Sequence, residues 1–214
     1  MSSGQRFKFN GSQVQVSIGS GVAKNITDIT EADPAVVTST AHGLALGTVG
    51  RIAAVVGMTE LNNKLFVVDN PATDDFELAG VDSTGYTPYT SGGTFTPLTY
   101  SDFCELTGAD QQDGTADEID VTTVCSTAKE FEVGLSDSGT LTLNYNYAPN
   151  STIQDAFRAA KKAGTEVAVR ITFPNAGGTI VMIGSVQQSS FTGAVGQVWT
   201  GNTQLKLTGE IFVL

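Results

Sequence analysis

Positively charged residues are scarce in this chain. Its 214 residues include 11 Lys and Arg against 22 Asp and Glu, which gives a formal net charge of −11 at pH 7. Phosphate backbones and anionic lipid surfaces attract proteins through Lys and Arg, so this balance nearly excludes a nucleic-acid binder. Charged residues of both signs make up only 15% of the chain, below the usual ~25%. The polar surface must therefore consist of hydroxyl, amide and glycine groups.

Residues that carry catalysis or bind metal are also few. The single histidine, His42, leaves Ser-His-Asp and Cys-His sets without support, and we interpret it as a loop residue. Cys104 and Cys125 are too few for a disulfide framework and lack the partner ligands of a zinc site. We expect two inert thiols, buried or half-buried, as suits a reducing cytoplasm. The sequence predicts no catalytic residue, no cofactor, no metal and no enzyme activity.

Long hydrophobic runs are missing. The longest aliphatic run, Ile52 to Val56, is far shorter than the ~20 residues that a membrane helix requires. Met1 to Gln13 contains no apolar stretch of the kind found in secretion signals. We therefore expect neither membrane insertion nor secretion.

The β-branched residues Thr and Val are abundant in this chain. The chain holds 28 Thr and 21 Val, which lose rotamer freedom in helices and pack well on pleated sheets. One segment alone has a helical pattern: in Ser151 to Gly164, the apolar residues recur at i, i+3, i+4 and i+7. These residues are Ile153, Ala156, Phe157 and Ala160. Ser151 and Gln154 match a capping box, and Gly164 supplies the stop. The sequence predicts a mainly β protein with one helix that packs through Ile153, Phe157 and Ala160.

Alternating patterns surround this helix. From Thr140 to Tyr147, apolar Leu and Tyr residues alternate with Thr140, Thr142, Asn144 and Asn146, so one strand face is wholly polar and uncharged. Other strands are expected at Val14–Ile18, Phe103–Leu106, Ile119–Cys125, Phe131–Leu135, Val167–Phe173, Thr179–Ser189 and Gln204–Phe212. The only tryptophan, Trp199, is expected at a strand entrance in the core. This arrangement indicates a β-sandwich or a sharply rolled barrel with one flanking helix.

The segment from Ile29 to Thr96 has a different character. Its acids outnumber its bases by eight to two, and Gly and Asn turns separate its short β runs. Those runs are Ala35–Ser39, Gly50–Val56, Lys64–Asp69 and Phe76–Ala79. We interpret residues 29–96 as an inserted small all-β subdomain within a discontinuous core domain, residues 1–28 and 97–214.

Acidic residues crowd one stretch, Gly108 to Asp120. It contains five acids and no base: Asp110, Asp113, Asp117, Glu118 and Asp120. Like charges without apolar surface favour a mobile solvated loop. A calcium site is the alternative, although the alternating spacing of a calcium loop is absent.

An ordered series of segments runs through the second half of the chain. It comprises Ile119–Thr123, Phe131–Gly139, the strand to Tyr147, the helix with Ala156 and Phe157, Val169–Pro174 and Gln204–Gly209. This series resembles the major tail tube proteins of long-tailed, siphovirus-type bacteriophages, and the resemblance covers roughly Phe7 to Asp28 and Tyr100 to Leu214.

The resemblance implies a rolled β-sandwich whose copies close into hexameric rings. The rings stack into a hollow tube that delivers DNA into the host, and the DNA passes through without specific binding. The implied partners are further copies of the chain and the tape measure, tail terminator and distal tail proteins. The implied location is the virion tail, after synthesis and assembly in the host cytoplasm. A long loop of that family reaches the neighbouring ring, and Gly108 to Asp120 is the matching position, so its five acids become candidate inter-ring residues.

The expected insertion has a resemblance of its own. Segments such as His42–Leu44, Val56–Asn62, Phe76–Leu78, Gly80–Tyr86 and Thr90–Thr94 are similar to a small β module of phage structural proteins. That module is named after a segment of ubiquitin-activating enzymes, but both cysteines lie outside residues 29–96, so no thiol chemistry is implied.

Two other functions stay open. Tyr86 and Tyr89 in the expected insertion motivate a non-enzymatic adhesion or carbohydrate-binding module. A tail terminator or a capsid decoration protein is the other alternative.

An acidic protein with uncharged polar strand faces suits a DNA conduit, because each Lys or Arg facing phosphate adds affinity through counterion release. The polar face at Thr140 to Asn146 suits either a channel wall or an outer surface.

Overall fold

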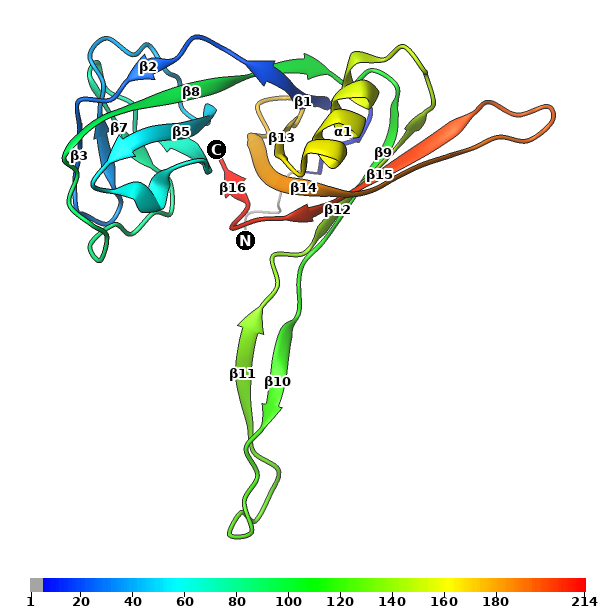
Figure 1. The fold of residues 1–214 in the computed structure, drawn as a ribbon. Coiled ribbons are helices and arrows are strands. Elements are labelled where there is room, and N and C mark those ends of the chain that lie inside the picture. The colour runs from blue at the N-terminus through cyan, green and yellow to red at the C-terminus, as the bar shows by residue number, and fades with distance from the viewer. Residues whose placement is uncertain (1–5) are drawn as a thin grey trace.

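The computed structural model describes residues 6–214, which form a mainly β protein with one α-helix, as the sequence predicts (Figure 1). The elements are β1 Gln13–Ser20, β2 Lys24–Asn25, β3 Asp28–Ile29, β4 Val36–Thr38, β5 Val49–Val56, a 3-10 turn Thr59–Leu61, β6 Leu65–Asp69, β7 Asp75–Leu78, β8 Ser91–Asp102, β9 Leu106–Gln112, β10 Ala116–Asp120, β11 Phe131–Ser136, β12 Thr140–Asn146, α1 Thr152–Ala163, β13 Glu166–Thr172, β14 Thr179–Thr192, β15 Thr200–Leu207 and β16 Phe212–Val213.

One large antiparallel sheet contains most of the strands. Its order is β3-β4-β7-β6-β5-β8-β1-β13-β14-β15-β12-β9, with β2 and β16 paired beside this path. Among the described residues the two ends of this order, β3 and β9, do not pair with each other, so the sheet rolls without closing into a barrel. β10 and β11 form a separate two-stranded sheet.

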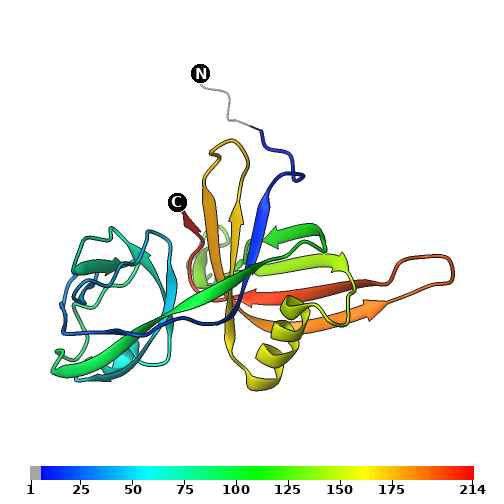
Figure 2. The ribbon, with the colours of Figure 1, turned by 90° about the horizontal axis from the view of Figure 1, so that it is seen from above.

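Strand β14 produces the roll. Its first half pairs with β13, from Thr179 to Ser185, and its second half pairs with β15, as far as Thr192. The register shifts between Val186 and Gln188, and such a bulge bends a strand and increases its twist. The β1–β13 part of the sheet therefore turns over the β12–β15 part, as the view from above shows (Figure 2).

The main hydrophobic core lies between these two parts of the sheet and helix α1. The apolar face of β12 points into it, with Leu141, Leu143 and Tyr145 fully or almost fully buried. Three helix residues, Ile153, Phe157 and Ala160, are buried in the same core. Because the helix has one apolar stripe, it covers the sheet with that stripe and exposes its lysines.

The two ends of the helix are stabilised in different ways. Gly164 ends it in the left-handed conformation, with φ +66°, and its N–H donates to the carbonyl of Ala160, as at many helix C-termini. The expected capping box is wrong, because Ser151 makes no side-chain cap. The buried Gln154 amide instead accepts from the Ala148 N–H and donates to the Asn146 carbonyl. It thereby fixes the connection from β12 to α1.

A second hydrophobic core lies within the strands of the expected insertion. It is built around Phe76 and Phe95, whose rings meet edge to face at 5.0 Å, and it also contains Met58 and Leu61. Its buried members run from Ile26 to Phe95. The chain enters and leaves this region side by side, since Lys24 and Asn25 pair with Phe95 and Thr94.

A third apolar cluster joins this region to the rest of the molecule. Val49 and Val67 pack there with Ala168, Val181 and Ile183 of β13 and β14. These residues alternate with Val169 and Met182 of the main core. The shared part of β13 and β14 is therefore buried on both faces, which explains its nearly continuous apolar sequence.

We propose that residues 29–96 are an inserted subdomain, and its removal tests this. Replacing them with a short Gly/Ser linker exposes Val181 and Ile183, which costs roughly 3–6 kcal/mol at about 1.5–3 kcal/mol for each side chain. We expect this deletion to be poorly soluble, and the same deletion with Val181→Thr and Ile183→Thr to give a soluble protein with a cooperative thermal transition by circular dichroism. An unfolded second variant would show that residues 29–96 are part of one indivisible core.

Candidate assembly surfaces

One face of a four-stranded portion of the sheet is polar and nearly free of charge. The strands are β9, β12, β15 and the outer half of β14, Val186–Thr192. Residues at paired positions share a face, so Asn144 lies beside Asn202, and Thr142 lies between Asp110 and Gln204. Further along the same face, Thr140 lies between Gln112 and Lys206. Lys206 forms an ion pair with Asp137. The alternation in the sequence predicts this polar face correctly.

Both edges of this four-stranded portion are open. β9 pairs with β12 on one side, and no strand among residues 6–214 lies on its other side. The outer half of β14 pairs with β15 on one side. Its other side is open, because β13 pairs with β14 only as far as Ser185. Open edges present unpaired N–H and C=O groups that favour pairing with another chain. The body thus offers two complementary strand edges.

The stretch that the sequence predicts as a mobile loop, Gly108–Asp120, is instead mostly strand. Asp110 lies on β9, paired with Thr142, and Asp113 follows directly after β9. The remaining three acids, Asp117, Glu118 and Asp120, lie on β10. The loop prediction fails because it weighed charge repulsion within the stretch and overlooked the pairing partners β11 and β12.

β10, β11 and their connecting turn form a hairpin, the arm (residues 116–136), which projects from the body (Figure 1). Paired residues place Glu118 beside Val133 and Asp120 beside Phe131 on one face. Val133 and Leu135 are 80% and 88% exposed. A lone hairpin is marginally stable in water, and large exposed apolar groups mark contact surfaces. The arm therefore has the properties of a segment that contacts a partner.

Hydrogen bonds favour the charged form of one arm acid. The Thr122 hydroxyl and backbone N–H hold the pKa of Asp120 below its usual value. Asp120 is therefore ionised near neutral pH.

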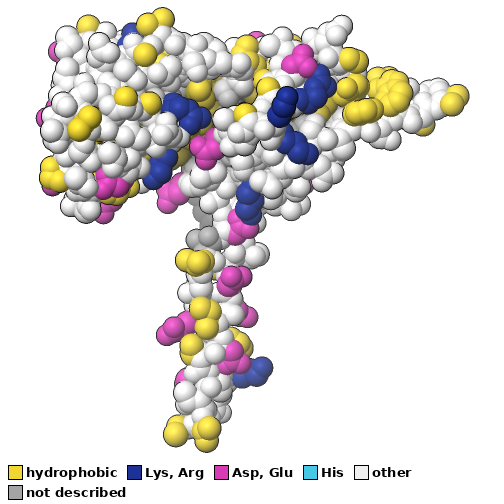
Figure 3. All heavy atoms as spheres, viewed as in Figure 1, with side chains coloured by type: hydrophobic (Ala, Val, Ile, Leu, Met, Phe, Trp, Pro, Cys, Tyr) yellow, Lys and Arg dark blue, Asp and Glu magenta, His cyan; other side chains and the backbone are white. Residues whose placement is uncertain are grey.

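A groove of about 430 Å³ lies between α1 and the β14–β15 hairpin. Tyr147 and Phe191 line it with stacked rings 4.6 Å apart. The remaining lining residues are Arg158, Lys161, Lys162 and Ser189. Arg158 pairs with Asp155 and donates to the Tyr147 hydroxyl, and the bond to Asp155 raises the pKa of Arg158. Figure 3 shows basic side chains beside apolar ones near this hairpin.

Trp199 extends the aromatic part of this groove. It precedes β15, at the strand entrance that the sequence predicts, and its ring lies 5.9 Å from that of Phe191. The expectation that it is buried in the core is wrong, since the residue is 54% exposed. The β14–β15 hairpin extends beyond the body (Figure 2), where no second layer covers it.

Comparison with known proteins identifies the family of this chain. The family model described as "Phage tail tube protein, TTP" matches residues 56–208, well over half of the chain. The chain belongs to the phage tail tube protein family. No curated protein matches it in sequence. The match supports the resemblance drawn from the main body, and it also extends into residues 56–96. A tail tube protein is a structural component of the virion tail and not an enzyme, in agreement with the sequence analysis.

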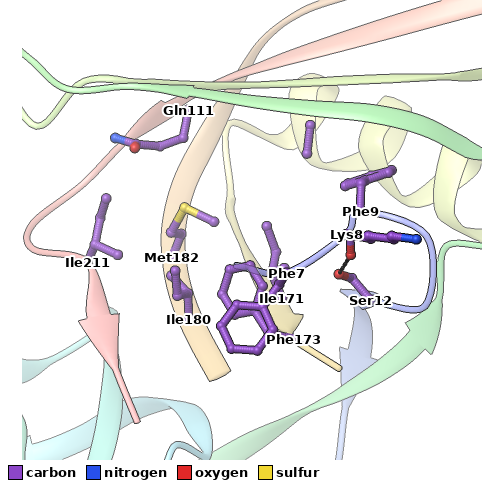
Figure 4. A pocket seen from close by; sticks show the side chains of 11 residues that line it. Phe7, Lys8, Phe9, Ser12, Gln111, Ile171, Phe173, Ile180, Met182 and Ile211 are labelled. Carbon is purple, nitrogen blue, oxygen red and sulfur yellow. Dashed lines mark hydrogen bonds between the residues drawn. The ribbon is translucent and has the colours of Figure 1, made fainter. Parts of the chain in front are cut away.

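An apolar pocket of about 290 Å³ lies at the opening between β9 and the β13–β14 hairpin. Residues Phe7 to Ser12 cross it, and the rings of Phe7 and Phe173 lie 5.6 Å apart (Figure 4). Ile171, Ile180 and Met182 line the opposite wall. Lys8, Ser12 and Gln111 are the polar side chains of its lining.

Within residues 6–214 of the tail tube protein, no three His, Cys, Asp or Glu residues cluster closely enough to hold a metal ion. Cys104 and Cys125 are both exposed, which corrects the expectation of buried or half-buried thiols; each lies in a turn outside the packed layers. No helix in the described part of the chain is long and apolar enough to cross a membrane.

The residues that motivated other functions have structural roles in the tail tube protein. His42 lies in a connecting loop, as expected, but it is fully buried, with Nδ1 accepting from Leu44 and Nε2 donating to the Asp75 carbonyl. Tyr86 and Tyr89 pack against the second core, and the Tyr89 hydroxyl donates to the Gly92 carbonyl. Both tyrosines are half-buried in this packing.

Trypsin tests the exposure of the arm. Lys129 is exposed in the turn between β10 and β11, and it is the only Lys or Arg between Lys64 and Arg158. A turn held by a single two-stranded ladder opens readily, so we expect the first tryptic cut of the free subunit at Lys129, leaving two large fragments on a gel. Lys129→Gln should remove this cut alone. A first cut elsewhere in the wild type would contradict the exposed arm.

Proposed function

We propose that this protein is the subunit from which a phage tail tube is built, as stacked rings that enclose a DNA conduit. The observation that carries the proposal is the four-stranded portion of the sheet, because it combines two open edges with a polar, nearly uncharged face. A monomeric protein would have to protect such edges. In the proposed tube, the open edges of neighbouring copies pair with each other, so they need no such protection.

Ring closure follows from the edges. β9 of one copy pairs with the outer half of β14 of the next copy, and repetition of this head-to-tail contact closes a ring. Each copy then contributes four strands to one continuous inner sheet. The proposed ring holds six copies, a number that rests on the resemblance to siphovirus-type tail tubes.

The polar face lines the conduit in this arrangement. Asn144, Asn202 and their neighbours present amides and hydroxyls, which hydrogen-bond to water and carry no charge that would hold phosphate. The excess of acids over bases in the whole chain also disfavours the binding of DNA phosphates. DNA thus passes through the tube without specific binding.

The other surfaces have separate roles in the proposed tail. The arm, which contains three of the five acids that the sequence singled out, contacts the adjacent ring. Residues 29–96 project outward, since their contacts to β13 and β14 lie away from the polar face. Tape measure, tail terminator and distal tail proteins are the proposed partners, assembly takes place in the host cytoplasm, and the tube functions in DNA ejection.

Electron microscopy of the purified protein tests this proposal. We expect hollow tubes of uniform width without added nucleotide or metal, and chelator should leave them intact. A terminator would stop at one ring, and a decoration or adhesion protein would stay small at any concentration. Either result would exclude the tube subunit.

Charge added to the polar face tests the conduit. Tubes of Asn144→Arg/Asn202→Arg should trap about tenfold or more DNA in a nuclease-resistant, salt-sensitive form, because paired arginines line the channel and hold phosphate. A control variant places the same charges on the expected insertion, at the exposed residues Thr40 and Thr73. Its tubes should leave DNA accessible to nuclease. Equal protection by both variants would show that the polar face does not line the channel.

A further inference from the structure

Two exposed surfaces of this chain, the arm and the groove beside α1, are complementary in charge, and both carry exposed apolar side chains. On the arm, Phe131, Val133 and Leu135 form an apolar row along β11, and Glu118 and Asp120 form an acidic row on β10 beside it. Because cross-strand partners share a face, both rows point in the same direction. The arm thus presents one surface that is half apolar and half anionic.

The groove between α1 and the β14–β15 hairpin has the opposite composition. Tyr147, Phe191 and Trp199 make an aromatic row, with Phe191 60% exposed. Lys161 and Lys162, in the last turn of α1, lie beside it and are exposed. Neither lysine makes an ion pair within the described part of the chain. In a chain with only 11 basic residues, two unpaired lysines next to an aromatic row are a notable concentration.

One chain cannot join its own arm to its own groove. The arm extends from one end of the body, and α1 lies at the opposite end (Figure 1). Contact between these surfaces therefore requires two copies of the chain.

We propose that the apolar and acidic face of the arm of one copy docks in the aromatic and basic groove of a copy in the adjacent ring. Phe131 and Val133 pack on Tyr147, Phe191 and Trp199, while Glu118 and Asp120 face Lys161 and Lys162. This inference rests on the proposed tube, and it names the surface that receives the arm. Opposite charges select the orientation, and the desolvated aromatic and aliphatic contacts supply the affinity.

Carboxyl-to-amine crosslinking of assembled wild-type protein tests the docking directly. A zero-length carbodiimide links only groups in direct contact. We expect mass spectrometry to find links from Glu118 or Asp120 to Lys161 or Lys162, and mixed isotopically labelled and unlabelled subunits to show that they are intermolecular. Arm carboxylates linked only to other lysines, or to none, would overturn the docking.

Charge reversal adds a functional readout. Lys161→Glu/Lys162→Glu and Glu118→Lys/Asp120→Lys should each raise the protein concentration needed for tubes by about tenfold or more, and the combined variant should restore it. Two controls, Glu132→Lys on the opposite arm face and Lys24→Glu/Lys64→Glu outside the groove, should assemble normally. Circular dichroism checks that each variant folds. Normal assembly of either groove or arm variant, or failed rescue, would contradict the proposal.

The only tryptophan of the chain separates failure of the docking from failure of the tube. Trp199 emission should shift to the blue and resist acrylamide quenching when arms occupy the grooves, in tubes or in smaller oligomers. Tubes without this shift and without the predicted crosslinks would overturn the docking and leave the proposed function intact. Oligomers that show both, but never form tubes, would support the docking and contradict the proposed function.

Discussion

The structure depends on the length of strand β14. Its first half completes the sheet that contains β1 and β13, and its second half continues alone beside β15. A bulge near Val186 bends the strand between these roles, so one strand both closes the core over α1 and extends an open edge beyond it. The unpaired backbone N–H and C=O groups of this edge favour pairing with a strand of another chain. The self-association that we propose uses this edge.

Charge distribution supports the same account. The polar face has amides and hydroxyls, and its one lysine, Lys206, is paired with Asp137. That pairing, together with the Gly139 N–H, lowers the pKa of Asp137. The unpaired lysines of α1 lie on the opposite side of the sheet, beside the aromatic groove. Cations are thus kept away from the surface that we propose faces DNA and placed where an acidic arm can meet them.

Much of the fold follows from the sequence, because its signals are local. The alternation from Thr140 to Tyr147 and the helical spacing around Phe157 each depend on a few neighbouring residues and predict β12 and α1 correctly. The expected strand Phe131–Leu135 corresponds to β11, but most of β10 falls in the stretch predicted as a mobile loop. That prediction fails because β10 acquires its structure by pairing with β11, more than ten residues later. The exposure of Trp199 and the groove beside it depend on a hairpin that extends past the core, and no local pattern reveals how far a strand extends beyond its layer.

Amide hydrogen exchange tests the central claim, that the open edges of β9 and outer β14 pair between copies. In the free subunit, the outward-facing amides of Leu106–Gln112 and Val186–Thr192 should exchange rapidly, since no strand in residues 6–214 covers them. In assembled protein they should slow by about 100-fold or more, as expected for amides that enter a stable sheet. The exposed residues 72–74, which lie outside the proposed contacts, serve as a reference within the same chain. Assembled protein in which both edges exchange as fast as in the free subunit would contradict the account.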